Sequence, residues 1–175
     1  MVKIVTTKQN MEMLRETATE VPVGDILGSE IQKIIKDMSD ALRSTEDGIG
    51  IAAPQIGVSK RIFVASEEAL FDASEKITPD IEKKTKKDWK HFIFINPEIV
   101  TVSKSTTHDA EGCLSVPGTY GLVTRSEKIK IRGYNELGKK VERGASGLFA
   151  RLFQHEIDHL NGILFIDKAA DLEKI

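Results

Sequence analysis

The sequence predicts an α+β fold in which antiparallel strands wrap around a central C-terminal helix. The middle of the chain holds short segments rich in β-branched and aromatic residues, separated by turn residues, which is typical of strands. A longer segment near the end, residues 146–162, has apolar residues at helical spacing and cap residues at both ends. Strands followed by a helix indicate α+β rather than alternating βαβ units.

Length and composition indicate one domain spanning residues 1–175. A chain of 175 residues with 40% hydrophobic residues can bury one sizeable core, since domains typically hold about 100–200 residues. The 25 basic and 27 acidic residues give a formal charge of -2, which argues against direct binding to nucleic acid or to an anionic membrane. A small-molecule or peptide ligand fits this charge better.

The sequence favours a soluble protein of a bacterial-type cytoplasm. No apolar run approaches the roughly 18 residues that span a bilayer, and the first residues lack the apolar core of a signal peptide and the character of a transit peptide. Cys113 is the one cysteine, so an internal disulfide is excluded and a reducing compartment is expected.

The first clear helix is expected after residues 1–23, which we assign to covering structure. Apolar residues recur at helical spacing from Leu27 to Leu42, and Ser29 with Gln32 predicts a capping box at the start. The turn signal Asp47-Gly48 follows the helix.

Residues 48–57 combine Gly48 and Gly50 with apolar residues. Glycine inside an extended segment often marks the close approach of a ligand or of another backbone. The segment lacks the Lys-Ser/Thr ending of a phosphate loop, so phosphate binding is not expected. An ordinary glycine-rich turn between helix and strand is an equal alternative for this segment alone.

The predicted strands are short and separated by turns at Asn135 and Gly138, with a stop at Asn96-Pro97 after the second strand. They cover residues 61–65, 91–95, 98–102, 127–132 and 139–142. The intervening residues 66–90 are charged and contain Pro79, Lys83, Lys84, Lys86 and Lys87. A lysine run of this kind usually forms a solvated surface, which we favour over a binding role.

The C-terminal helix is predicted from Ser146, as N-cap, to Asn161-Gly162, as C-cap. At about 100° per residue its residues separate into an apolar side and a polar side. The polar side carries Arg151, Gln154 and Asp158. The apolar side carries Glu156 and, within one narrow arc, Leu148, Leu152, His155 and His159.

This arc predicts a metal site. His155 and His159 lie one helical turn apart, so both imidazoles can bind one ion. Glu156 follows the first histidine and can reach a water on that ion as a general base. Two histidines with ordinary structural hydrogen bonds are the simpler interpretation, which the adjacent inward carboxylate disfavours.

A catalytic centre of this type usually has a third protein ligand. The candidates are Cys113, which offers a thiolate, and two histidines, His91 on a predicted strand and His108 in a polar loop. Cys113 lies in residues 111–118, between a glycine and a proline, where a rigid backbone and close approach are expected. A nucleophilic Cys-His pair is the rival use of the thiol, but it leaves the rest of the helix motif without a role.

Three segments resemble the motifs of the peptide deformylases, in the order that this family shows. They are GIGIAAPQ at residues 48–55, EGCLS at 111–115 and QHEIDHL at 154–160. The resemblance runs from residue 48 to residue 167, apart from residues 66–90, which look like an insertion. The chain lacks the proline-rich start common in the family, and it ends without the long C-terminal helix that some members use on the ribosome, so docking by that route is not expected.

The resemblance implies a metal held by Cys113, His155 and His159, with iron(II) as the native ion and zinc, nickel or cobalt as substitutes. The residues alone do not choose among these ions. The metal would lower the pKa of its bound water, and Glu156, in apolar surroundings, would take the proton of that water and deliver it to the leaving amine.

The same resemblance implies the remaining site residues. The side-chain amide of Gln55 and the backbone N–H of Leu114 would donate to the oxyanion. Glu111 and Arg125 would form a supporting pair beside the cysteine. An apolar pocket for methionine and an edge that pairs with an extended peptide are expected from Gly48, Ile49, Gly50, Leu148 and Leu152.

The implied activity is hydrolysis of the formyl group from the N-terminal formylmethionine of newly made polypeptides, with release of formate. The implied protein is a monomer that associates transiently with the ribosome. A metalloprotease is the enzymatic alternative, but its third ligand lies downstream, where the thirteen residues after Gly162 offer Asp167, Asp171 and Glu173. A metal-stabilised binding module or an inactive member is the other alternative, and a replaced Glu156, its usual sign, is not seen.

Overall fold

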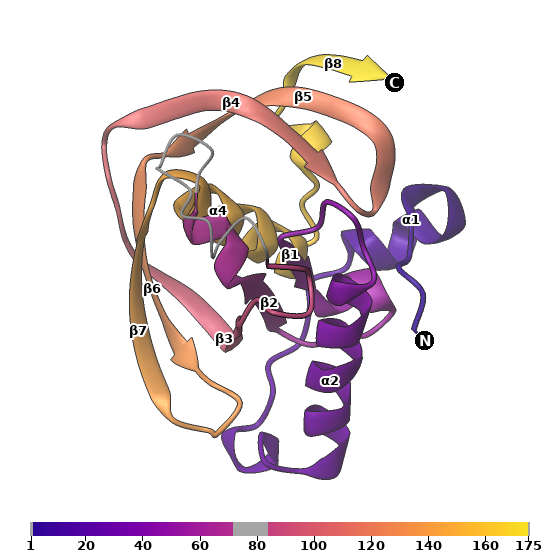
Figure 1. Ribbon diagram of the computed structural model, residues 1–175, viewed down its shortest axis with the longest axis vertical. Helices are drawn as coiled ribbons and strands as arrows, with labels where there is room; N and C mark the ends of the chain where they lie inside the picture. The colour runs from indigo at the N-terminus through magenta and orange to yellow at the C-terminus, as the bar shows by residue number, and fades with distance from the viewer. Residues whose placement is uncertain (1, 72–83, 175) are drawn as a thin grey trace.

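The computed structural model describes residues 2–71 and 84–174 and shows helix α4 near the centre of the molecule with strands on several sides (Figure 1). Two sheets and three helices make up most of this part of the chain. The helices are α1 (Thr7–Arg15), α2 (Ser29–Arg43) and α4 (Gly147–Leu160). The strands are β1 (Gly50–Ala52), β2 (Ile62–Ser66), β3 (His91–Val102), β4 (Thr106–Cys113), β5 (Val116–Ser126), β6 (Lys128–Tyr134), β7 (Lys140–Ser146) and β8 (Ala170–Lys174).

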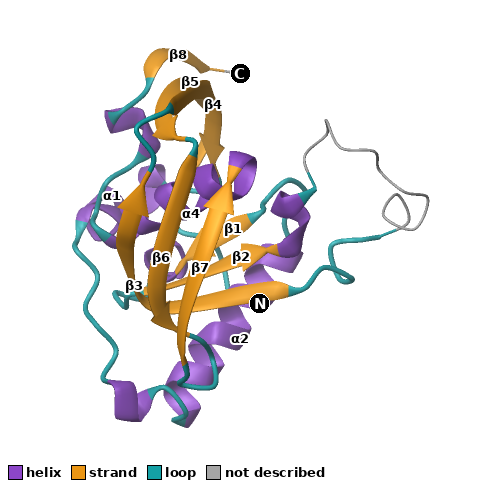
Figure 2. Ribbon diagram, turned by 90° about the vertical axis from the view of Figure 1, so that its left-hand side faces the viewer, coloured by secondary structure: helices purple, strands orange, loops and turns teal. Residues whose placement is uncertain are grey.

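Both sheets are antiparallel. The larger has the strand order β1-β2-β3-β6-β7 and the smaller has the order β4-β5-β8. Figure 2 shows β4, β5 and β8 grouped at one end of the molecule and α2 toward the other end. Helix α4 contacts β1, β2, β6 and β7 of the larger sheet and β5 of the smaller one.

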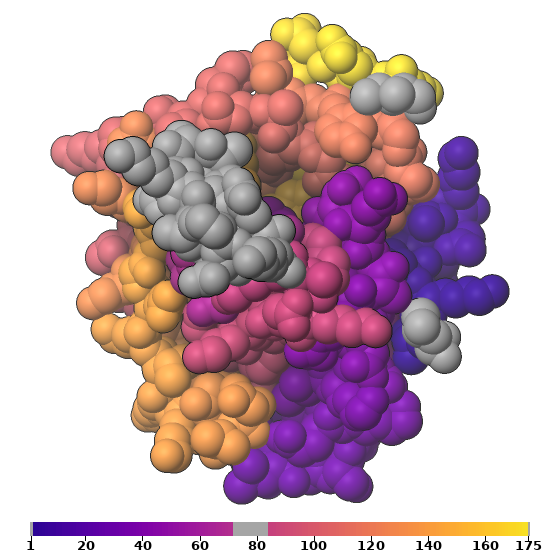
Figure 3. Space-filling view, in the orientation of Figure 1, coloured from indigo at the N-terminus to yellow at the C-terminus, as the bar shows by residue number. Residues whose placement is uncertain are grey.

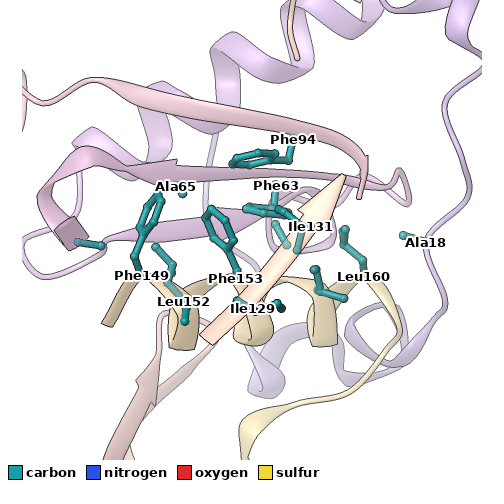
Figure 4. Close-up of a cluster of buried hydrophobic side chains, with 14 residues drawn as sticks. Ala18, Phe63, Ala65, Phe94, Ile129, Ile131, Phe149, Leu152, Phe153 and Leu160 are labelled. Carbon is teal, nitrogen blue, oxygen red and sulfur yellow. The ribbon is translucent and has the colours of Figure 1, made fainter. Parts of the chain in front are cut away.

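Strand β2 is buried on both faces, because helices cover both sides of the larger sheet there. Alternate side chains of a strand point to opposite faces. Phe63 and Ala65 belong to the apolar cluster that includes α4, whereas Ile62 and Val64 belong to the cluster that includes α2. Figure 4 shows the first cluster, in which the side chains of Phe149 and Phe153 and other apolar residues lie between α4 and the sheet.

The predicted mixed class, with antiparallel strands and a helix near the C-terminus, is confirmed. The sequence pattern predicted that this helix is the last element. That prediction is wrong, because β8 follows the helix and pairs with β5. All five residues of β8 are exposed, so this strand lacks the alternating pattern of a half-buried one.

The predicted stop at Asn96-Pro97 is wrong. Strand β3 continues through these residues to Val102, with a register shift between Ile95 and Glu98 where it pairs with β6. Asn96 has a φ of 50°, and its side chain bonds both backbone groups of Val21. The irregularity accommodates a proline, which has no N–H to donate to the ladder.

The predicted capping box of α2 is also wrong. Gly28 is the N-cap residue, and the side-chain amide of Gln32 donates to the carbonyl oxygens of Ile26 and Glu136. Leu27 precedes the helix and is 67% exposed, so it does not extend the apolar face of that helix.

The charged segment between β2 and β3 is described only in part. Pro79 and Lys83 lie outside the described residues, whereas Lys84, Lys86 and Lys87 lie within them. In the part of the chain that the structure describes, no helix combines the length and the apolar character needed to cross a bilayer.

Candidate metal centre

Helix α4 carries His155, Glu156 and His159. It begins after Ser146 and has Asn161 as its C-cap, as predicted, and it holds the two imidazole centroids 5.0 Å apart. Glu156 is 2% exposed and His159 is 1% exposed. One rigid element therefore holds two imidazoles and a carboxylate away from solvent.

Cys113 reaches the same place from the β4–β5 hairpin. It ends β4, and the chain then turns into β5, so residues 111–118 form a hairpin end rather than an isolated loop. Its Sγ lies 3.2 Å from Nε2 of His159. The ligand atoms of Cys113, His155 and His159 all lie within 4.8 Å of one another, and within residues 2–71 and 84–174 this is the one such group of three or more Cys, His, Asp or Glu residues.

The other two candidate ligands lie elsewhere. His108 is an exposed residue of β4, not of a polar loop as predicted, and its Nδ1 lies 2.9 Å from Oγ1 of Thr124. His91 begins β3, as predicted for a strand residue. Burial and the charge of Arg43 lower the pKa of His91 to about 4, so this imidazole is neutral at physiological pH.

The three side chains provide a donor set that fits a divalent cation. Burial raises the pKa of the Cys113 thiol, but His159 and His155 outweigh that effect and hold this pKa well below its ordinary value. Burial lowers the pKa of His155, whereas hydrogen bonds to Cys113 and Glu111 raise it to about 10. A thiolate and two imidazole nitrogens at this spacing suit zinc, iron, cobalt or nickel.

Glu156 is a buried carboxylate beside these ligands. Its Oε2 has no hydrogen-bond partner among the described residues. Burial raises the pKa of Glu156 to about 7, although His155 and His159 oppose this shift. A Cβ at position 50 would lie 2.5 Å from Cδ1 of Leu152 and 2.7 Å from Oε1 of Glu156, so a larger residue than Gly50 would displace these side chains. A group that titrates near neutral pH can both accept and donate a proton.

Gln55 lies beside Cys113, and Leu114 follows that cysteine in the chain. Gln55 is 1% exposed, and its Oε1 accepts from the N–H of Ala52 at 2.8 Å. This bond orients the amide so that Nε2 lies 3.6 Å from Sγ of Cys113 and 3.2 Å from Oγ of Ser115. An N–H donor beside the ligands is thereby held in place.

Glu111 and Arg125 form a buried bidentate pair. Nε of Arg125 donates to Oε1 at 2.9 Å and Nη2 donates to Oε2 at 3.0 Å. Oε2 also lies 3.0 Å from Nδ1 of His155, which leaves Nε2 of that ring for another partner. Burial raises the pKa of Glu111, but His155 and Arg125 hold it well below the ordinary range. The resemblance implied a supporting pair beside the cysteine, and the pair observed here also contacts a histidine.

The sequence analysis placed Arg151 and Asp158 on the polar side of the helix and did not predict their contacts with Glu111 and Arg125. Both lie on the polar side of α4, but they are only 7% and 8% exposed because the β4–β5 hairpin covers them. Arg151 donates to Glu111 at 2.7 Å, and Asp158 bonds Arg125. The helix carries as many polar residues as Phe, Leu and Ile residues, so its composition gave no signal that both sides are buried.

A cavity of about 430 Å³ opens onto these groups. The space-filling view shows the molecule hollowed between the β4–β5 hairpin and the segment that precedes β1 (Figure 3). Its walls include the residues predicted to bind a substrate. They are Gly48, Ile49, Gly50, Leu148 and Leu152, joined by Gln55, Leu114, His155 and Glu156.

Comparison with known proteins identifies relatives along the whole chain. The family model described as Polypeptide deformylase matches residues 1–175. The peptide deformylase of Carboxydothermus hydrogenoformans is 43% identical over 160 residues, covering 91% of this chain and 89% of the relative.

Solved structures agree with that match. A peptide deformylase from Legionella pneumophila superposes with a TM-score of 0.76 at 36% identity, covering 97% of this chain and 86% of the other. A peptide deformylase from Ehrlichia chaffeensis gives a TM-score of 0.80 at 31% identity, with 97% and 88% covered. Sequence and fold thus lead to one conclusion: the chain belongs to the peptide deformylase family.

Proposed function

We propose that Cys113, His155 and His159 hold the metal ion of this peptide deformylase. The chain is a hydrolase that removes the N-formyl group from newly synthesised polypeptides, the activity of its family. The observation that carries the assignment of the site is the meeting of three ligand atoms within 4.8 Å beside an unpartnered buried carboxylate, at the wall of a cavity. In this proposal α4 is a metal-binding helix wrapped by strands, in one domain spanning residues 1–175.

Iron(II) is our proposal for the native ion, from the family resemblance, with zinc, nickel or cobalt as substitutes that the donor set accepts. When bound, such an ion supplies Lewis-acid activation of water and of the formyl oxygen. Glu111, bonded to Nδ1 of His155, fixes the ring so that Nε2 is the ligating nitrogen.

Glu156 is the proton carrier in this proposal. As a carboxylate it accepts a proton from the water that attacks the formyl carbon. It then delivers that proton to the amine nitrogen as the C–N bond breaks, so that formate and a free amino terminus leave. A pKa of about 7 suits both steps, because neither protonation state is strongly favoured at neutral pH.

The developing oxyanion receives hydrogen bonds from Nε2–H of Gln55 and from the backbone N–H of Leu114. Loss of one such donor typically costs about 2.7–4 kcal/mol of transition-state stabilisation. The methionine side chain lies against Leu148 and Leu152, and an extended peptide pairs with the edge formed by residues 48–50. Main-chain pairing of this kind tolerates varied sequence beyond the first residue.

We also propose a monomer that meets nascent chains by transient association with the ribosome, in a bacterial cytoplasm. The bacterial origin of the relatives supports the compartment. The formal charge of -2 argues against a broad nucleic-acid surface.

Formate release decides the function. The metal-loaded protein is incubated with a formyl-methionyl peptide and with an internally blocked peptide that lacks the formyl group. Formate from the first alone supports deformylation, whereas cleavage of the second would identify a metalloprotease. Absence of any reaction with metal bound would support a metal-stabilised binding module.

Two substitutions test the roles at the site. Cys113→Ser should lower the metal content, while His108→Asn, an exposed histidine of the same hairpin, should leave it unchanged. Glu156→Ala should retain metal and lose turnover, and activity retained in that variant would remove the proposed proton carrier.

The deformylase of Synechococcus elongatus has been solved in complex with actinonin, so we expect actinonin to raise the melting temperature of the protein described here.

A further inference from the structure

The segment between β2 and β3 reaches back to the cavity wall through Lys86. Its Nζ donates to the carbonyl oxygen of Gly48 at 3.1 Å and to Oε2 of Glu68 at 2.6 Å. Gly48 lies in the cavity wall, in the glycine-rich stretch that precedes β1. A side chain from the apparent insertion therefore bonds the backbone of a predicted substrate-binding residue.

The backbone that carries Lys86 is itself anchored. The N–H of Thr85 donates to Oδ2 of Asp88 at 2.7 Å, which forms a local turn. Trp89 is 6% exposed, and the ammonium of Lys84 lies 4.3 Å from its ring centroid. The position of Lys86 thus follows from a buried aromatic anchor and a hydrogen-bonded turn.

Gly48 is restrained on its other sides as well. Its N–H donates to Oγ1 of Thr45 at 3.2 Å. A Cβ at this position would lie 2.4 Å from Oγ1 of Thr45 and 3.0 Å from Leu114, so no other residue fits without a shift. The next carbonyl, that of Ile49, accepts from the N–H of Ser66 at 2.7 Å. Lys86 provides the restraint on the Gly48 carbonyl.

A fixed edge matters because glycine is the most flexible residue of the backbone. Residues 48–50 contain two glycines, and an unrestrained edge would have to lose conformational freedom when a peptide pairs with it. Holding the edge beforehand removes that cost from binding. Such an effect acts on the bound substrate and on the transition state alike, so it raises affinity without changing the chemical step.

We propose that Lys86 is a positioning residue for the substrate, which holds the residue 48–50 edge ready to pair with an extended formylated peptide. The inference rests on the proposed function of that edge. Glu68 supports Lys86 by fixing its ammonium group. The segment 66–90 thereby contributes to substrate affinity through its described residues, although the sequence favoured a solvated surface.

Steady-state kinetics of the metal-loaded protein test this proposal. With a formyl-methionyl tripeptide as substrate, Lys86→Met should raise KM about five-fold while kcat stays within about two-fold of the wild-type value. Lys86→Arg keeps the charge and a donor and should restore most of the affinity. Lys87→Met, the exposed neighbour, is the matched control and should behave like wild type, and Glu68→Gln should give a smaller rise in KM.

Amide hydrogen exchange provides a reading that does not depend on turnover. Exchange at Ile49 and Gly50 should be faster in Lys86→Met than in wild type, and unchanged in Lys87→Met. Unchanged exchange and KM in Lys86→Met would overturn the proposal, as would an equal effect of Lys87→Met. A wild-type protein that releases no formate would instead refute the proposed function, and the exchange data would still decide whether Lys86 orders the edge.

Discussion

The two sheets are attached to helix α4 by different forces. On the side of the larger sheet, Phe153 of the helix packs against Phe63 and Phe94, with ring centroids 5.5 and 5.0 Å apart. On the side of the smaller sheet, buried charges take this role, because Arg151 of the helix bonds Glu111 and the hairpin carbonyl of Val123.

The difference matters for the position of the proposed metal ligands. Apolar contacts are non-directional, so a core tolerates small displacements of one element against another. Charge-assisted hydrogen bonds have defined partner atoms and short distances. Cys113 lies on the hairpin and His155 on the helix, so the ionic interface is the one that sets the distance between ligands. Both sides of α4 therefore contribute to stability, whereas we expect the geometry of the proposed ligands to depend largely on the ionic side.

Replacing Phe153 by alanine should have the largest effect on stability. The side chain is fully buried, and Phe→Ala in a core costs about 3–5 kcal/mol of unfolding free energy. Urea unfolding of the metal-loaded protein measures this loss, with Leu137→Ala, 56% exposed, as the control. The metal affinity of the folded variant should change less than about three-fold, because Phe153 packs on the side of α4 that faces the larger sheet. A large loss of metal affinity would contradict the separation of roles.

Glu111→Gln should lower metal affinity as well as stability. The variant leaves Arg125 and Arg151 without their buried carboxylate, and such a loss costs about 3 kcal/mol of stability. Metal affinity should also fall by about 10–100-fold, because the partner of His155 is altered. Competition with a chelator measures the affinity, and Glu142→Gln, an exposed carboxylate of β7, serves as the control. Metal affinity equal to wild type would show that the ionic side does not position the ligand.

Acid should weaken the ionic side first. The folded-state pKa of Glu111 lies well below its unfolded value, so its carboxylate stabilises the fold above the unfolded pKa of about 4.3, and this contribution is lost as pH falls toward the folded pKa. The stability gap between wild type and Glu111→Gln should therefore narrow from pH 7 to pH 3. Denaturation of the metal-free proteins in urea at several pH values tests this. If the difference in unfolding free energy between wild type and Glu111→Gln were the same at pH 7 and pH 3, the ionised carboxylate could not be the cause of that difference.

The smallest effect is expected for an ion pair on the outer surface of the larger sheet. Arg132 and Glu98 form a pair at 2.7 Å, but their side chains are 61% and 59% exposed. Exposed pairs contribute about 0–1 kcal/mol, so Arg132→Met should change unfolding free energy by no more than that in a thermal or urea melt. A larger loss would show that exposed charges also hold this sheet.

Local patterns in the sequence predicted the helix of the site well. Its caps and its 3.6-residue period are set by neighbouring residues, so α4 begins and ends where expected and brings His155 and His159 together. Cys113 is more than forty residues away in sequence; its thiolate chemistry made it one of three candidates for the third ligand, and its resemblance to a known motif selected it before the fold was known.

Other features depend on tertiary contacts that no local pattern encodes. Arg151 and Asp158 look like solvated residues until a hairpin covers them. Asn96 is a strand stop by composition, yet pairing on both sides of the irregularity keeps β3 continuous. The role proposed for Lys86 follows from a bond between segments 38 residues apart, which the lysine-rich composition conceals.

The short edge strand β1 has a consequence for association between copies of the folded protein. A sheet edge with unpaired backbone groups is a template for pairing between copies of a protein, and natural proteins protect such edges. Strand β1 lies at the edge of the larger sheet, but it has only three residues, all buried. The short length and the burial of β1 therefore oppose pairing of this edge between copies of the protein.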